Sequence, residues 1–126
     1  MDAADLYALD PEEFTAARDV AAKAAKSDGD AAAAKALKAL RKPSVSAWVV
    51  NRLAVEQRDL LDQLLALGPA LAQAQSGGRA DELRALGRQR RELVEAVTSS
   101  AVGAVGRPVS TAVREEVAST LEAALS

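Results

Sequence analysis

The chain has 126 residues, a formal net charge of -2, and neither Cys nor His. This length suits one domain with one core, so we predict a single domain over residues 1–126. The charge excludes the strongly basic balance of a nonspecific nucleic-acid coat protein. The missing residue types exclude disulfides, thiolate zinc sites and imidazole ligands or bases.

No apolar run approaches the roughly 18 residues that are needed to cross a bilayer. The N-terminal segment is acidic, with Asp2, Asp5 and Asp10, whereas a signal peptide starts with a basic region. We therefore expect a cytoplasmic protein that has no membrane-spanning segment, no metal and no cofactor.

Helix signals divide the N-terminal part of the chain. Asp10 can cap a helix that starts at Pro11 and ends before Gly29, which predicts a first helix over about 11–27. A second helix over about 31–42 is expected to stop at Pro43. The expected inward residues are Phe14, Ala17, Val20, Ala21, Ala24 and Ala25 in the first helix, and Ala33, Ala36, Leu37 and Leu40 in the second.

The rest of the chain also has only helical patterns. Ser44 can cap a third helix that runs to about Glu56, and Ser110 can cap a last one. Between them we predict a long helical hairpin with arms at about 59–76 and 80–104, and we expect Pro69 to kink its first arm. The predicted fold is therefore all-α, an antiparallel bundle of about five to six helices.

Three charged residues fall on faces that are otherwise apolar: Arg52, Glu56 and Arg90. Because an unpaired buried charge is costly, our main interpretation is an internal polar network in which each of them has a partner. The alternative is a recess for an anionic group or a partner's carboxylate, lined by Trp48, Asn51, Arg52 and Arg90. Trp48 by itself is more typical of a core anchor.

Two basic stripes are candidate surfaces for an acidic partner. Their members are Lys35, Lys38 and Lys42 on the second helix, and Arg84, Arg88 and Arg91 on the second arm of the hairpin. The basic region 35–58 and its tight 42–44 connection weakly resemble a helix-turn-helix, whose second helix meets base edges. Another interpretation is that the lysine row docks the acidic N-terminal segment.

An enzyme is the least supported class. No spacing pairs the available nucleophiles and bases convincingly. Gly77-Gly78 lacks the Lys and Ser/Thr of a phosphate-binding loop. The acidic pairs 81–82 and 115–116 consist of adjacent residues, which diverge on a helix and make poor metal ligands.

Segments 6–14, 40–53 and 88–94 are similar to a family of uncharacterised actinobacterial proteins. The similarity spans nearly the whole chain. In that family a region of this size precedes a long Ala-, Glu- and Arg-rich segment that looks like a coiled coil. The resemblance implies that this chain is the helical N-terminal part of a longer protein, and it brings no activity and no assigned binding residues.

The sequence thus predicts a non-enzymatic helical module that binds a protein partner, with self-association as one form of that binding. The alternative is a nucleic-acid-binding domain that uses the basic 35–58 region in a helix-turn-helix-like arrangement.

Overall fold

The computed structural model describes residues 1–126 and contains eight helices and no strand, so the predicted all-α class is confirmed. The helices are α1 (Ala3–Ala8), α2 (Pro11–Ser27), α3 (Ala31–Lys38), α4 (Val45–Glu56), α5 (Arg58–Leu65), α6 (Leu67–Gly77), α7 (Ala80–Ala104) and α8 (Thr111–Ala124). Their number exceeds the prediction because α1 was not foreseen and the first hairpin arm is divided into α5 and α6. None of them is both long enough and apolar enough to cross a membrane.

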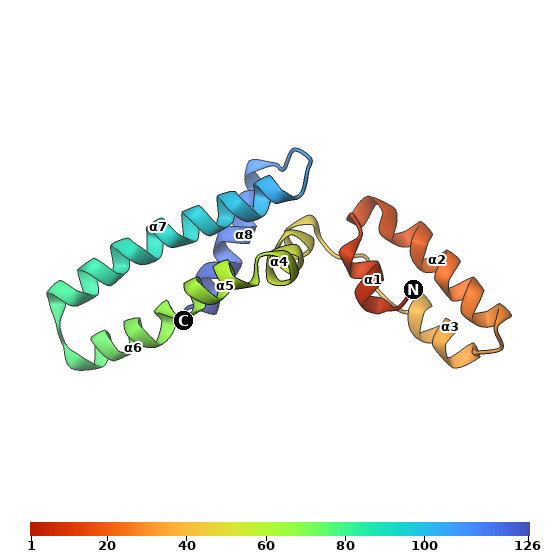
Figure 1. The fold of residues 1–126 in the computed structure, drawn as a ribbon, viewed down its shortest axis with the longest axis horizontal. Helices are drawn as coiled ribbons and strands as arrows, with labels where there is room; N and C mark the ends of the chain where they lie inside the picture. The colour runs from red at the N-terminus through yellow and green to blue at the C-terminus, as the bar shows by residue number, and fades with distance from the viewer. The chain divides into compact units, whose positions relative to one another are not determined.

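The chain forms two compact units, Met1–Asn51 and Arg52–Ser126, and the boundary falls within α4. The first unit contains α1 to α3 and the first part of α4, and the second contains the rest (Figure 1). The expectation of one domain over residues 1–126 stays a prediction.

In the first unit, α2 and α3 form an antiparallel pair and α1 packs on α2 (Figure 1). The rings of Tyr7 and Phe14 stack with their centroids 5.5 Å apart, and Leu6 and Phe14 are fully buried. Trp48 in α4 is 2% exposed, and its Nε1 donates a hydrogen bond to the carbonyl of Ala8 over 3.3 Å. Trp48 therefore has the surroundings of a core residue.

The helix α3 ends at Lys38, so the expected helix over 31–42 is wrong at its C-terminal end. The backbone N–H of Leu40 bonds to the carbonyl of Leu37 over 3.1 Å, and this tighter three-residue spacing closes the last turn of α3 before Pro43. The guanidinium of Arg18 in α2 donates a hydrogen bond to the carbonyl of Leu40 over 3.1 Å. A side chain from the neighbouring helix thus satisfies a backbone group beyond the helix end.

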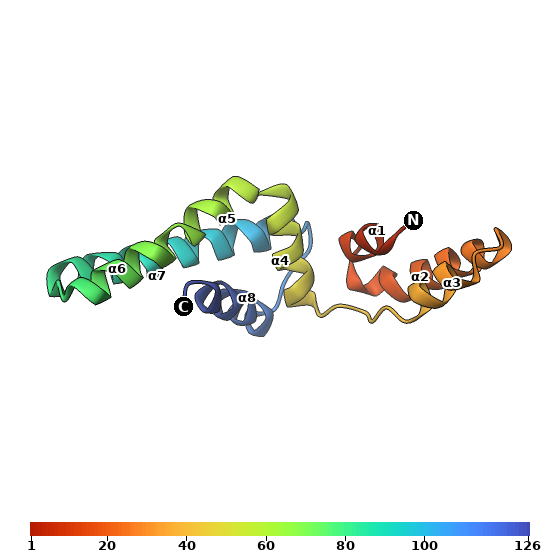
Figure 2. The ribbon, with the colours of Figure 1, turned by 90° about the horizontal axis from the view of Figure 1, so that it is seen from below.

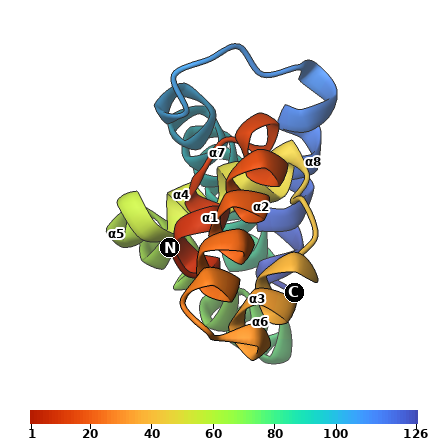
Figure 3. The same ribbon diagram turned by 90° about the vertical axis from the view of Figure 1, so that its right-hand side faces the viewer.

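In the second unit, α7 packs against α5, α6 and α8 (Figure 2). Figure 3 shows the connection between α7 and α8, residues 105–110, as a wide loop at the top of the view. The predicted hairpin is present, with α5 and α6 as its first arm and α7 as its second. The core of this unit is aliphatic and includes Leu61, Leu64, Leu67, Ala74, Val94, Val97, Ala101, Val117 and Leu121.

Pro69 explains why the first arm of the hairpin is divided. It cannot donate a backbone hydrogen bond to Leu65, which is the last residue of α5. Ala66 between the two helices keeps helical dihedral angles, φ -63° and ψ -20°, so α6 continues the arm. The kink that we expect at Pro69 is therefore a short break between α5 and α6, at Ala66.

Gly77 and Gly78 end the first arm, and their substitutions are expected to act in opposite directions. Gly78 caps α6 with φ +66°, a left-handed conformation in which an alanine costs about 1 kcal/mol. Gly77 is helical, and an added methyl group would meet only Cγ of Arg79, at 4.0 Å. Gly77→Ala should therefore stabilise by up to about 1 kcal/mol. Urea denaturation of Gly78→Ala and Gly77→Ala measures the two changes in the free energy of unfolding. Changes of the same sign would contradict the left-handed conformation of Gly78 or the helical conformation of Gly77.

Candidate functional site

An apolar groove lies between α2 and α3 of the first unit and has a volume of about 670 Å³. Most of its lining comes from α2 and the residue after it, at the i, i+3, i+4 spacing of one helix face: Glu13, Ala16, Ala17, Val20, Ala21, Ala24, Ala25 and Asp28. Met1 and the α3 residues Ala33 and Leu37 complete it. The groove is thus aliphatic along its length, with a carboxylate at each end of the α2 face.

Part of the apolar lining of this groove is open to solvent. Val20 is 70% exposed and Met1 is 66% exposed, and α3 has no buried residue. The expected inward residues of the second helix are therefore at most partly covered: Ala33, Ala36, Leu37 and Leu40. A contiguous exposed apolar surface is typical of a site that binds a protein or another apolar partner.

The predicted inward stripe of α2 is only partly packed: Phe14 is buried, whereas Val20 and Ala24 are exposed. The buried residues of α2 are Pro11, Phe14 and Ala22, and Arg18 has only 19% of its side chain exposed. The packed face is therefore centred on positions 14, 18 and 22, and the face that carries Val20 lines the open groove. An arginine stem can pack against apolar neighbours while its guanidinium finds polar partners, which is what places Arg18 on the packed face.

Arg18, Asp19 and Lys38 form a polar cluster that joins α2 to α3. The Asp19 carboxylate accepts a hydrogen bond from Lys38 Nζ over 2.9 Å and another from Arg18 Nε over 3.1 Å. These two cations, Lys38 foremost, lower the pKa of the Asp19 carboxyl below its ordinary value. Lys38 therefore contacts one acidic residue within residues 1–30, and docking of the whole lysine row on the acidic N-terminal segment stays a prediction.

The predicted lysine row is not a continuous helix face. Lys35 and Lys38 are exposed on α3, but Lys42 lies beyond its end. The connection from α3 to α4 comprises residues 39–44, so the tight turn that motivated the helix-turn-helix comparison is absent. Ser44 does cap α4, because its Oγ accepts a hydrogen bond from the backbone N–H of Ala47 over 3.1 Å.

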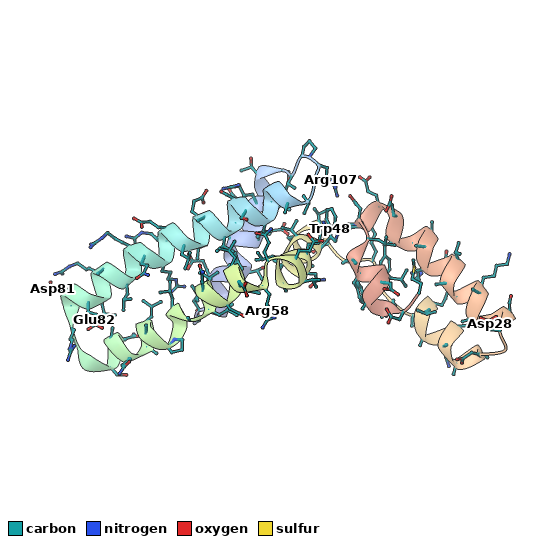
Figure 4. The ribbon with its side chains drawn as sticks, in the orientation of Figure 1. Asp28, Trp48, Arg58, Asp81, Glu82 and Arg107 are labelled. Atoms are coloured by element: carbon teal, nitrogen blue, oxygen red, sulfur yellow. The ribbon has the colours of Figure 1, made fainter.

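The predicted arginine face of α7 is present as a surface. Arg84, Arg88 and Arg91 are exposed and line one shallow hollow of about 360 Å³ together with Leu83. Arg84 forms an ion pair with Asp81, which Figure 4 places at the start of α7. Arg88 and Arg91 have no ion pair, so two of the three guanidinium groups are available to an acidic partner.

Trp48 and Asn51 of the predicted recess belong to the first unit, and Arg52 and Arg90 belong to the second. Trp48 is buried, whereas Asn51 is exposed on α4. Arg52 pairs with Glu56 one turn later, with a nitrogen–oxygen distance of 2.9 Å. The charge of Arg52 therefore has a partner, as the interpretation as an internal polar network requires. The recess lined by all four residues stays a prediction.

Arg90 joins α7 to α8. Its Nε donates a hydrogen bond to the Glu122 carboxylate over 2.7 Å, and its Nη2 donates another to the backbone carbonyl of Glu122 over 3.2 Å. The Arg90 side chain is 29% exposed. These contacts support a structural role in which a charge on an apolar face ties two helices together.

No group of three or more acidic side chains is arranged to hold a metal ion. No protein-family model matches the chain, and no curated protein or solved structure is significantly similar to it. The resemblance to an actinobacterial family therefore stays a prediction. Among the surfaces described above, the groove between α2 and α3 combines an apolar lining with side chains that stay exposed, such as Val20 and Met1.

The predicted inward stripe does not separate this groove from the packed face of α2, although the sequence carries a signal for it. Two apolar faces occur on α2, one through Phe14 and Ala22 and one through Ala17, Val20 and Ala24. A helix that packs on one side needs only one such face. The second face continues with the same spacing from residue 13 to residue 28. It therefore indicates a second contact surface on α2.

The stability of the α2–α3 pair is expected to depend on the ionisation of Asp19. Because folding lowers the pKa of this carboxyl, its contribution is complete above the ordinary value of 3.8 and is lost as the pH falls through the lower folded value. Thermal melts of the wild type and Asp19→Asn should therefore differ near neutral pH and converge in acid. Lys38→Met should reproduce the effect and Lys35→Met should not. A difference that stays constant with pH would contradict the assignment.

Replacing Arg90 is expected to destabilise the second unit. Arg90→Ala removes two hydrogen bonds to Glu122, and it should lower the free energy of unfolding by about 1–2 kcal/mol. Arg88→Ala is the matched control on an exposed position of the same helix, and it should change stability by less than about 0.5 kcal/mol. Circular dichroism melts compare the two. Equal melting temperatures of Arg90→Ala and Arg88→Ala would contradict a structural role of Arg90 and would favour the predicted recess.

Proposed function

We propose that the protein is a non-enzymatic helical interaction module that binds an α-helix of another protein in the groove between α2 and α3. The observation that carries this proposal is the exposed apolar face of α2. Val20 at its centre is 70% exposed while Phe14 on the other face is fully buried. An amphipathic helix that lays its apolar face into such a groove is a recurring mode of protein recognition.

The dimensions of the groove suit one helix. The helix α2 has 17 residues, which corresponds to about 25 Å of helix length. Alanines along its open face allow a partner helix to approach closely, and Val20 and Leu37 supply larger apolar contacts on either side. Burial of these side chains would provide the main favourable term for binding.

Nucleic-acid binding through the 35–58 region receives less support. Lys38 is engaged by Asp19, and Lys42 does not continue the helical row of Lys35. Of the positive charges on which that alternative depends, Lys38 is therefore partly neutralised and Lys42 lies outside the helical row. The face with Arg84, Arg88 and Arg91 stays a candidate second surface for an acidic partner, whose charges would steer association more than hold it.

A designed peptide tests the proposed function. The probe is a helical peptide of Leu and Ala heptads with uncharged polar residues elsewhere, and its binding to the chain is measured by calorimetry. Val20→Glu places a charge in the middle of the groove without disturbing a buried contact, so it should weaken binding at least about tenfold. Thr15→Glu, on an exposed position of α2 outside the groove lining, should leave binding unchanged. Equal affinities of both variants would exclude the groove as the binding surface.

A further inference from the structure

We further propose that the helix received by the groove carries lysine or arginine residues at its ends, foremost at the end that lies against Asp28. This inference rests on the proposed function and adds the chemistry of the partner. Every charged side chain in the groove lining is acidic: Glu13 at one end and Asp28 at the other. The lysines of α2, Lys23 and Lys26, lie outside the lining.

The spacing of the two carboxylates defines the length of the partner segment. Glu13 and Asp28 belong to one helix face that spans about 22 Å at the rise of an α-helix. This distance corresponds to about four turns of a partner helix. A fitting segment is therefore apolar over about four turns and basic where it leaves the groove.

The two ends of the groove differ in electrostatic strength. Asp28 follows the last turn of α2 and caps it, so its charge adds to the negative end of the α2 dipole. The positive end of the α3 dipole at the same turn is already capped by the Asp30 carboxylate. Figure 4 places Asp28 at the turn between α2 and α3. Glu13 lies in the first turn of α2, where the positive end of the dipole offsets its charge. The Asp28 end should therefore select cations more strongly than the Glu13 end.

The same charges disfavour a second copy of this chain as the occupant. In a two-fold symmetric pair, each groove meets the identical surface of its partner. An antiparallel pairing of two α2 helices places Glu13 opposite Asp28, and a parallel pairing places each carboxylate opposite itself. Both arrangements therefore place carboxylates opposite carboxylates. Like charges directly opposite one another destabilise an interface. A basic helix from a different protein avoids this repulsion.

The experiment compares two peptides with the same Leu and Ala face, one with lysines and one with glutamates at both ends. The lysine-ended peptide should bind at least about fivefold more tightly at low salt, and the preference should shrink as salt is added. Asp28→Lys should weaken the lysine-ended peptide and strengthen the glutamate-ended one. Glu115→Lys, an exposed position of α8 with the same change in net charge, should change neither affinity.

The outcomes separate this inference from the proposed function. If both peptides bind equally, depend on Val20 and ignore Asp28→Lys, the groove binds helices but its end charges do not select them, and the inference is overturned alone. If no peptide binds, the proposed function fails as well. Light scattering of the chain and of Val20→Glu checks for self-association. A dimer that becomes monomeric in the variant would overturn the inference in favour of a second copy.

Discussion

The arrangement of the first unit depends on where the Arg18 side chain is satisfied. Its guanidinium reaches a backbone carbonyl beyond α3 and the carboxylate of Asp19, which Lys38 of α3 also contacts. Arg18 lies on the side of α2 that also carries the buried residues Phe14 and Ala22, whereas Val20 is exposed. A partly buried cation and the stacked rings of Tyr7 and Phe14 therefore belong to the packed face of α2, and the proposed binding groove lies on the face with Val20.

Local signals predict most of the helices but not the features that define the groove. Caps such as Asp10 and Ser110 act within three residues of themselves, so the starts of α2 and α8 follow from the sequence. Beyond the end of α3, the carbonyl of Leu40 is satisfied by Arg18, which is 22 positions away. The phase of α2 also depends on other elements, such as the Tyr7 ring that stacks on Phe14 and the Leu40 carbonyl that Arg18 contacts.

The charged residues on apolar helix faces show the same difference between local and distant contacts. Arg52 finds Glu56 at a helical spacing of four, which a sequence pattern can anticipate. Arg90 finds Glu122 at a separation of 32 positions, and only the packing of α8 on α7 brings the two together. The sequence indicates that each arginine requires a partner, whereas the identity of a distant partner emerges only from the tertiary fold.

The alanine content of the groove has an entropic consequence. Alanine has no rotamers to lose, so a surface built from it binds without the ordering cost of long side chains. Such a surface is rigid before its partner arrives and makes few demands on the shape of an incoming aliphatic side chain. The middle of the groove would therefore accept many apolar helices at similar affinity, and discrimination among them would have to come from features outside that middle.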